Sequence, residues 1–450
     1  TVKVLNRIAG GGSRSSRLRA NIVGLLSRKG IGAVLSYILI PVILDYIDPY
    51  RYGVWLTMVS VVNWLYIFDV GLGNGMQNAL AAALARKDMI LGKRIVSTTY
   101  VLMASIAIVL LLAITISGPL LDWGVVFNVR GDIATDVALG VGITGVFYVM
   151  QLVVRLIGVV LTADERPALA GYFNTIGSLL TLLVVLLVKP HVPGSIALLS
   201  CIMGVANLLP PLVASFVLYR SQYRDIRPSW RRRDMSMAPE LFMLGGKFLV
   251  LQLSAVVIYT TDNLIITQMF SPAEVTPYAL AAKYVGFVTI GYGIILKPFW
   301  ASFTHAHELG EVVWIRRMVK KLHFMWGGVV FATFTLVAVS PYIYDMWLGG
   351  KVDIPMSLTV LMGIHVVMFN YGQIYSKYLN GVGKLEVQFR LSIITAIINI
   401  PISMFFAGPL GMGVNGVILG TICTNIPVVL AAPYQYYQLS TGRAQGIWSK

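Results

Sequence analysis

This sequence has little charge and almost no cysteine. Only 12% of its 450 residues are Asp, Glu, Lys or Arg, whereas 57% are hydrophobic and the mean hydropathy is +0.77. A soluble domain of this length needs a far more charged surface, so the composition excludes that class and indicates a polytopic α-helical membrane protein. The two cysteines, Cys201 and Cys423, lie in apolar runs and form neither a disulfide framework nor a metal-binding spacing.

Motifs of the common enzyme classes are missing as well. The sequence contains no Gly-x-x-x-x-Gly-Lys-Ser/Thr, so we do not expect it to hydrolyse a nucleotide itself. It also contains no His-Glu-x-x-His, no cluster with metal-ligand spacing and no nucleophile elbow, so we expect no metal, no cofactor and no catalytic residue. Any energy source would therefore have to be an ion gradient, the membrane potential or a substrate gradient.

What the chain has instead is a series of long apolar runs. A helix needs about 20 mostly apolar residues to cross the hydrocarbon core of a bilayer. We therefore predict an all-α polytopic membrane protein with twelve transmembrane helices. Their approximate limits are residues 18–47, 51–85, 93–117, 133–163, 167–188, 194–219, 239–270, 274–306, 312–340, 354–380, 385–407 and 412–437.

Basic residues are unevenly shared between the predicted loops. The chain has 35 Lys and Arg against 19 Asp and Glu, a net charge of +16. One set of alternating loops holds nearly all of the loop cations, and the other holds only Arg51, Arg130, Lys189 and Lys351. By the positive-inside rule, this asymmetry predicts that both termini are cytoplasmic, and it accounts for most of the net charge without a nucleic-acid partner.

The sequence also suggests an internal duplication. Leu161 and Asn207 are 46 residues apart (207 − 161), and Leu379 and Asn425 are again 46 residues apart (425 − 379). Two related halves of six helices each would have the same orientation in the membrane, with a substrate site between them. The predicted parts are a cytoplasmic basic arm, an N-terminal lobe, a cytoplasmic basic linker, a C-terminal lobe and a cytoplasmic tail, at residues 1–17, 18–220, 221–238, 239–437 and 438–450.

Several predicted helices carry cations within the apolar region. A charge at the centre of a membrane helix costs about 2.5–3.5 kcal/mol, so it normally faces a bundle interior or a wet cavity. Arg28 and Lys29 lie two to three turns into the first helix, and Lys247 lies at a similar depth in the seventh. Lys283 and Lys297 share one face of the eighth helix with intervening glycines, although two snorkelling lysines would give the same pattern.

The fourth and tenth helices have polar stripes that each include one cation. The stripes are Tyr148–Gln151–Arg155 and Asn370–Gln373–Lys377, and either cation could line a cavity or snorkel to the interface. Only two carboxylates lie deep in predicted helices. Asp69 precedes a glycine-rich stretch where the helix can bend, and it could pair with Arg28 or another cation or serve ion coupling. Asp262, toward the outer end of the seventh helix, could make a polar contact between helices.

The excess of intramembrane cations over carboxylates favours an anionic substrate. Arg presents a planar fork to phosphate oxygens and Lys a mobile point charge, so a phosphate or pyrophosphate is the expected group. An enzyme such as a glycan polymerase or ligase is an alternative to a protein that carries an anionic substrate through a cavity. The predicted extracytoplasmic loops are short, however, and leave little room for catalytic residues. A non-transporting scaffold would have no use for buried charge stripes.

Two stretches give the chain a family resemblance. "YGVW" at Tyr52–Trp55, followed by "DVGLGNG" at Asp69–Gly75, resembles the Wzx-type O-antigen and polysaccharide flippases of the MOP (MATE-like) transporter superfamily. In the second half, "TTDNLIITQMFSPAEVTPYALAAK" resembles the corresponding family segment, with Asp262 at the family's Asp position.

The resemblance implies a flippase that moves an undecaprenyl-pyrophosphate-linked oligosaccharide across the bacterial cytoplasmic (inner) membrane by alternating access. The partners that it implies are membrane lipids and the proteins that polymerise the polysaccharide and set its chain length. The protein itself is expected to be a monomer. Related lipid II flippases have a cationic central cavity with basic residues on their first, second and eighth helices, and Arg28, Lys29, Lys283 and Lys297 fit the first and eighth. The second helix here offers Asp69 instead. The alternative within the superfamily is a MATE-like multidrug or cation antiporter, whose cavity would need more carboxylates.

Overall fold

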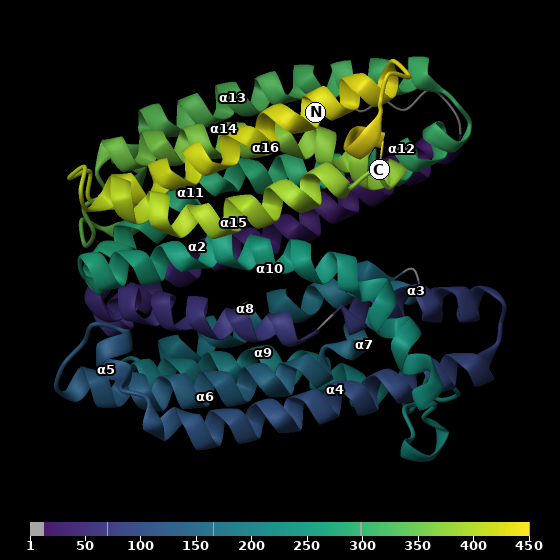
Figure 1. The fold of residues 1–450 in the computed structure, drawn as a ribbon. Helices are drawn as coiled ribbons and strands as arrows, with labels where there is room; N and C mark the ends of the chain where they lie inside the picture. The colour runs from purple at the N-terminus through teal and green to yellow at the C-terminus, as the bar shows by residue number, and fades with distance from the viewer. Residues whose placement is uncertain (1–12, 70, 165, 298, 450) are drawn as a thin grey trace.

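The computed structural model describes residues 13–69, 71–164, 166–297 and 299–449, although for a minority of these, chiefly 13–31 and 240–252, it describes the backbone and not the side chain. Every regular element in this part of the chain is a helix (Figure 1). The α-helices of the first half are α2 (Ser13–Val62), α3 (Leu72–Ala85), α4 (Met89–Ser117), α5 (Trp123–Val126), α6 (Asp132–Val154), α7 (Leu156–Ala163), α8 (Pro167–Val188) and α9 (Ile196–Leu218). Those of the second half are α10 (Ala238–Met269), α11 (Pro272–Leu296), α12 (Phe299–Glu308), α13 (Val312–Leu348), α14 (Met356–Val382), α15 (Glu386–Ala407) and α16 (Val414–Ser440). Short 3₁₀ segments are η1 (Asn63–Asp69), η2 (Gly118–Leu120), η3 (Trp230–Arg232), η4 (Met235–Met237) and η5 (Gly446–Ser449).

Nine helical segments of the described residues are long and apolar enough to cross a membrane. They correspond to the third to sixth and the eighth to twelfth predicted spans, which confirms the all-α membrane class. The other three predicted spans fall in α2, its continuation into α3, and α10, where side chains are partly outside the described residues.

The first half of the chain contains helix breaks that its hydropathy profile does not reveal. α2 turns at Asp48, whose φ of 66° and ψ of 162° are not helical, so it is two helices joined end to end. The second of these ends at Val62, and the chain continues as η1 before α3 begins at Leu72. Gly71, with φ of 72°, takes the left-handed conformation that glycine adopts without steric cost. The predicted bend after Asp69 is therefore present.

The two halves occupy different parts of the molecule. Figure 1 shows α4, α6 and α9 on one side and α13, α14 and α16 on the other, with α10 along the boundary. α2 packs against α8 of its own half and against α11 of the other half. α10 in turn packs against α15 and against α3. α2 and α10 thus each contact both halves.

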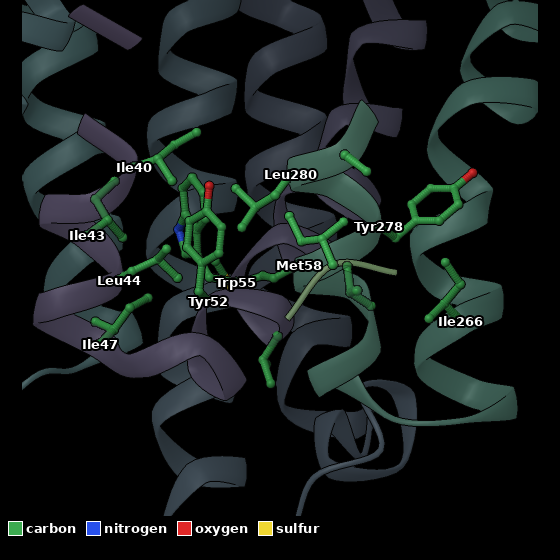
Figure 2. Close-up of a cluster of buried hydrophobic side chains, with 14 of the residues drawn as sticks. Ile40, Ile43, Leu44, Ile47, Tyr52, Trp55, Met58, Ile266, Tyr278 and Leu280 are labelled. Carbon is green, nitrogen blue, oxygen red and sulfur yellow. The ribbon is translucent and has the colours of Figure 1, made fainter. Parts of the chain in front are cut away.

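Among the side chains that the structure describes, the apolar core is shared at one end of the molecule and divided at the other. At the end where α2 turns at Asp48, called here the Asp48 end, one cluster joins both halves (Figure 2). It includes Ile40 and Tyr52 from α2 and Ile266 and Leu280 from α10 and α11. At the opposite end, called the linker end, the first half has its own cluster, which includes Leu72, Leu152 and Ile226, and the second half has another, which includes Leu296, Phe303 and Tyr378.

Candidate functional site

Asp69 and Arg155 form an ion pair at two helix breaks. Asp69 is the last residue of η1, and Arg155 is the turn residue between α6 and α7. Nη2 of Arg155 lies 2.7 Å from Oδ2 of Asp69, with the side chains 32% and 16% exposed. The backbone N–H of Gly73 donates to Oδ1 of Asp69 at 3.4 Å, so the carboxylate also lies at the N-terminus of α3, where the helix dipole favours a negative charge. The pair therefore ties the start of α3 to the α6–α7 turn.

Arg155 also lines a cavity inside the first half. The cavity has a volume of about 490 Å³ and is enclosed by α2, α6, α7, α8 and α9. The predicted stripe of the fourth helix, Tyr148, Gln151 and Arg155, faces it, together with Asn174 of α8 and Asn207 of α9. Several of its polar groups therefore converge on one space.

A second cavity lies at equivalent positions of the second half. Its volume is about 320 Å³, and it is enclosed by α10, α14, α15 and α16. Eight residues of the first cavity correspond to eight of the second at a constant offset of 218 residues. The pairs are Phe147 and His365, Gln151 and Phe369, Arg155 and Gln373, Gly158 and Ser376, Ala170 and Gln388, Asn174 and Ser392, Asn207 and Asn425, and Pro211 and Val429.

The asparagines of the repeat make the same hydrogen bond in both halves. Nδ2 of Asn207 donates to the carbonyl oxygen of Met203, and Nδ2 of Asn425 donates to that of Thr421, each at 2.8 Å and each one helical turn back. The 46-residue spacing seen in the sequence therefore reflects equivalent positions in space. The charged position is not preserved, since Gln373 stands where the first half has Arg155.

Lys283 lies at the contact between α2 and α11. Its Nζ donates to the carbonyl oxygen of Ser36 at 3.1 Å, and the Tyr37 hydroxyl donates to the Lys283 carbonyl oxygen at 2.5 Å. The ammonium also lies 5.6 Å from the centre of the Tyr37 ring, within the range of a cation–π interaction. Lys283 therefore bridges the two halves in this conformation.

Further polar contacts join the halves toward the Asp48 end. Oγ1 of Thr276 donates to the Pro49 carbonyl oxygen at 2.6 Å, and Nδ2 of Asn263 donates to the Ser60 hydroxyl at 2.8 Å. At the surface, Lys351 of the second half pairs with Asp45 of the first. These contacts and Lys283 form a set that we call the outer seam, because the topology predicted from the loop charges places the Asp48 end outside.

Asp262 is buried among three helices of the second half. Oδ2 of Asp262 accepts hydrogen bonds from the Tyr278 hydroxyl at 2.5 Å and from Oγ1 of Thr421 at 3.4 Å, which links α10 to α11 and α16. Its other oxygen, Oδ1, is buried and has no hydrogen-bond partner in the described part of the chain. The polar contact between helices that the sequence suggested is therefore present.

The remaining predicted cations lie elsewhere or cannot be placed. Lys297 is exposed at the end of α11, just before α12, and Lys377 lies 5.7 Å from the centre of the Trp300 ring. The side chains of Arg28, Lys29 and Lys247 lie outside the described residues, although their backbones belong to α2 and α10.

The sequence predicted that Asp69 could pair with Arg28 or another cation, and the structure pairs it with Arg155. Sequence reasoning missed one feature of this arrangement. It treated Lys283 only as a cavity or snorkelling residue, whereas the structure places its ammonium against the Ser36 carbonyl oxygen. The 218-residue offset could have revealed the paired cavities, because it is already present in the Asn207 and Asn425 spacing.

Similar proteins are found at the level of sequence and of structure, although no family model matches the chain. A protein of Yersinia pseudotuberculosis, which its name assigns provisionally to O-antigen export, is 22% identical over 415 residues, covering 89% of this chain and 91% of the relative. A Salmonella typhi protein, named provisionally as an O-antigen transporter, is 20% identical over 419 residues, covering 91% and 93%.

Among solved structures, the chain is similar to a multidrug-resistance MATE transporter of the MOP superfamily in its inward-facing conformation. The TM-score is 0.70 at 13% identity, over 93% of this chain and 95% of the other. The outward-facing conformation of a MATE transporter gives a TM-score of 0.66 at 14% identity, over 98% of both chains. The chain therefore has the fold of these MATE transporters, and its predicted resemblance to O-antigen transporters is confirmed.

Proposed function

We propose that this protein is a flippase that carries an undecaprenyl-pyrophosphate-linked oligosaccharide from the inner to the outer leaflet of the bacterial cytoplasmic membrane. The proposal rests on a transporter fold and on two full-length relatives named for O-antigen export or transport. That the substrate is linked to a lipid through a pyrophosphate is the more specific part of the proposal. The excess of cations over carboxylates in the predicted membrane helices supports it.

The division of the apolar core is the observation that carries the mechanism. Among the described side chains, the halves share a core and the polar contacts of the outer seam at the Asp48 end, and they have separate cores at the linker end. With the basic linker assigned to the cytoplasm by the positive-inside rule, this division supports an arrangement of two six-helix lobes closed to the outside. Rocking of one lobe against the other would break the outer seam and close the linker end.

The pyrophosphate is assigned to a cationic path between the lobes. We propose that Arg28, Lys29, Lys247, Lys283 and Lys297 form this path, with Arg155 at its side. Lys297 is exposed at the linker end, and Lys283 lies about 14 residues or 21 Å further along the same helix, toward the outer seam. A phosphate group can therefore pass from one lysine to the other along α11. Contact with an anion would draw the Lys283 ammonium from the Ser36 carbonyl oxygen and loosen the seam.

The two deep carboxylates take different roles in this proposal. Asp69 is the charge partner of Arg155 and holds that cation at the edge of the path. Asp262, buried beside Tyr278 and with one oxygen lacking a hydrogen-bond donor, is the carboxylate suited to binding a proton or a coupling cation.

Alanine substitution of Arg28 and Lys297 tests the cationic path. The double variant should lose O-antigen display at the cell surface while the protein remains at its normal level in the membrane, because two of the five cations of the proposed path are gone. The matched control is Lys320→Ala with Lys321→Ala, two lysines near the start of α13 that the same topology places on the cytoplasmic side, which should leave display unchanged. Normal display in the Arg28/Lys297 variant would rule out this path.

A drug or cation antiporter is the second candidate, because the solved neighbours named above are multidrug transporters. That function would need a carboxylate facing the transported cation, and the structure instead occupies Asp69 with Arg155. Efflux of a cationic dye that is lost in Asp69→Asn would favour the antiporter over the flippase.

A further inference from the structure

The basic linker between the halves is folded onto the first half. Tyr223 and Ile226 are buried in the apolar cluster of that half. Beyond them, the Ser229 N–H donates to the Ser97 hydroxyl at 3.0 Å and the Asp234 N–H donates to Oγ1 of Thr98 at 2.8 Å. The linker is therefore held against the first turns of α4 and keeps its cations in fixed positions.

A further ion pair secures the end of the linker. Arg94 of α4 pairs with Asp234, and the Ser236 hydroxyl donates to Oδ1 of Asp234 at 2.6 Å. The hydrogen bonds from Ser236 and the Arg94 guanidinium hold the pKa of the Asp234 carboxyl below its usual value. This carboxylate stays ionised at neutral pH, so the attachment persists under physiological conditions.

The folded linker and α4 together line a basic hollow. Its volume is about 650 Å³. Six of its lining residues are Lys or Arg and two are Asp, which leaves an excess of four positive charges (6 − 2). The cations are Lys93, Arg94, Arg224, Arg231, Arg232 and Arg233, and the acids are Asp225 and Asp234. The positive-inside rule explains why cations are abundant on this side, but it does not explain why they converge on one hollow.

Exposed apolar side chains stand at the edge of the same hollow. Met89 and Ile90 line it at the start of a membrane-spanning helix, and the Ile90 side chain is 74% exposed. Trp230 is 65% exposed, and the Arg233 guanidinium lies 4.3 Å from the centre of its ring. Tryptophan with arginine is typical of the level where lipid headgroups meet acyl chains. A free phosphate or a nucleic acid would make no use of this apolar edge.

We propose that this hollow binds the headgroup of an anionic phospholipid of the inner leaflet. The phosphate would lie among Arg231, Arg232 and Arg233, and the acyl chains would run down α4 past Met89 and Ile90. Clusters of four to eight cations beside a membrane helix bind anionic lipids. A bound lipid would fix the linker, and with it the spacing of the two halves at the linker end.

Lipid retention by the purified full-length protein tests the proposal. Native mass spectrometry would count phosphatidylglycerol retained from mixed phosphatidylglycerol and phosphatidylcholine micelles. The wild type should retain phosphatidylglycerol selectively, and Arg231→Gln/Arg232→Gln/Arg233→Gln should weaken retention by about tenfold or more, given the loss of three cations. The matched control, Arg317→Gln/Lys320→Gln/Lys321→Gln, removes three cations of the second half and should retain the lipid as the wild type does.

Two further arms keep the test decisive. Ile90→Ser with Trp230→Ser removes only the apolar edge and should also reduce retention, without changing any charge. Inorganic pyrophosphate should displace phosphatidylglycerol poorly, because it cannot occupy that edge. The proposal would be overturned by equal retention in the wild type and the triple Gln variant. It would also be overturned if pyrophosphate competed as well as a short-chain phosphatidylglycerol, which would identify a simple anion site.

Discussion

The two cavities of the molecule share their positions but differ in charge. Asn207 and Asn425 occupy equivalent positions in the two halves and make equivalent hydrogen bonds, so the helices around the two cavities are arranged in the same way. The first cavity has Arg155 paired with Asp69, whereas the second has the neutral Gln373. The difference extends to the backbone, since Arg155 separates α6 from α7 and Gln373 lies within the unbroken α14. In this fold, the charge pair and the helix breaks occur together.

This comparison indicates that the break after α6 and the charge of Arg155 belong to the first half's cavity alone, among the two cavities compared. A helix break exposes backbone groups that need partners, and a membrane helix tolerates it only where protein or water supplies them. The carboxylate of Asp69 supplies one such partner to the Gly73 N–H. At the site equivalent to Arg155, the second half has the continuous helix α14 and the neutral side chain of Gln373.

The largest expected effect is on the charge pair. Arg155→Met should destabilise the protein by about 2 kcal/mol, because it leaves the largely buried Asp69 carboxylate without its cation. The loss should be smaller than for a fully buried pair, because Arg155 is partly exposed to solvent. The equivalent change Gln373→Met leaves no charge unpaired and should cost less than about 1 kcal/mol. Thermal unfolding of the detergent-purified proteins measures both.

A double variant separates the pair from the individual residues. Asp69→Asn combined with Arg155→Met should recover much of the stability lost in Arg155→Met, because no unpaired charge remains. If Gln373→Met proved as destabilising as Arg155→Met, the charged cavity would not differ from the neutral one in the way described.

A smaller effect is expected from the backbone at the break. Gly71→Ala should destabilise by about 1 kcal/mol, because an L side chain is strained at a φ of 72°. Gly286→Ala is the matched change in the unbroken α11, where nothing lies within 4 Å of an added Cβ, and it should be neutral or stabilise slightly. The midpoints of thermal unfolding compare the two, and equal midpoints for both variants would show that the break carries no strain.

The smallest difference is expected between the paired asparagines. Asn207→Ala and Asn425→Ala each remove one hydrogen bond to a carbonyl oxygen four residues back, so each should cost about 1 kcal/mol. The two losses of stability should agree within about 0.5 kcal/mol, measured by unfolding under the same conditions. A much larger loss at one of them would mean that the two positions are not structurally equivalent.

Much of the fold could be predicted because its signals are local. Apolar length gave the nine spans found among the described helices, and the glycines after Asp69 indicated the bend that Gly71 provides. The partner of Asp69 could not be predicted, since several cations lie at similar depths and only helix packing decides that Arg155 reaches it. The bridge from Lys283 to Ser36 depends on the same packing, because 247 residues separate the two positions.

Translocation by the purified protein in proteoliposomes tests the central claim most directly. An undecaprenyl-pyrophosphate-linked oligosaccharide would be placed in one leaflet, and its appearance in the other would be followed by cleavage with an enzyme that cannot cross the bilayer. The wild type should move the lipid, and Lys283→Met should slow it strongly while the protein remains folded. The account would be contradicted if the wild type left the lipid-linked oligosaccharide in its leaflet while exporting a cationic dye.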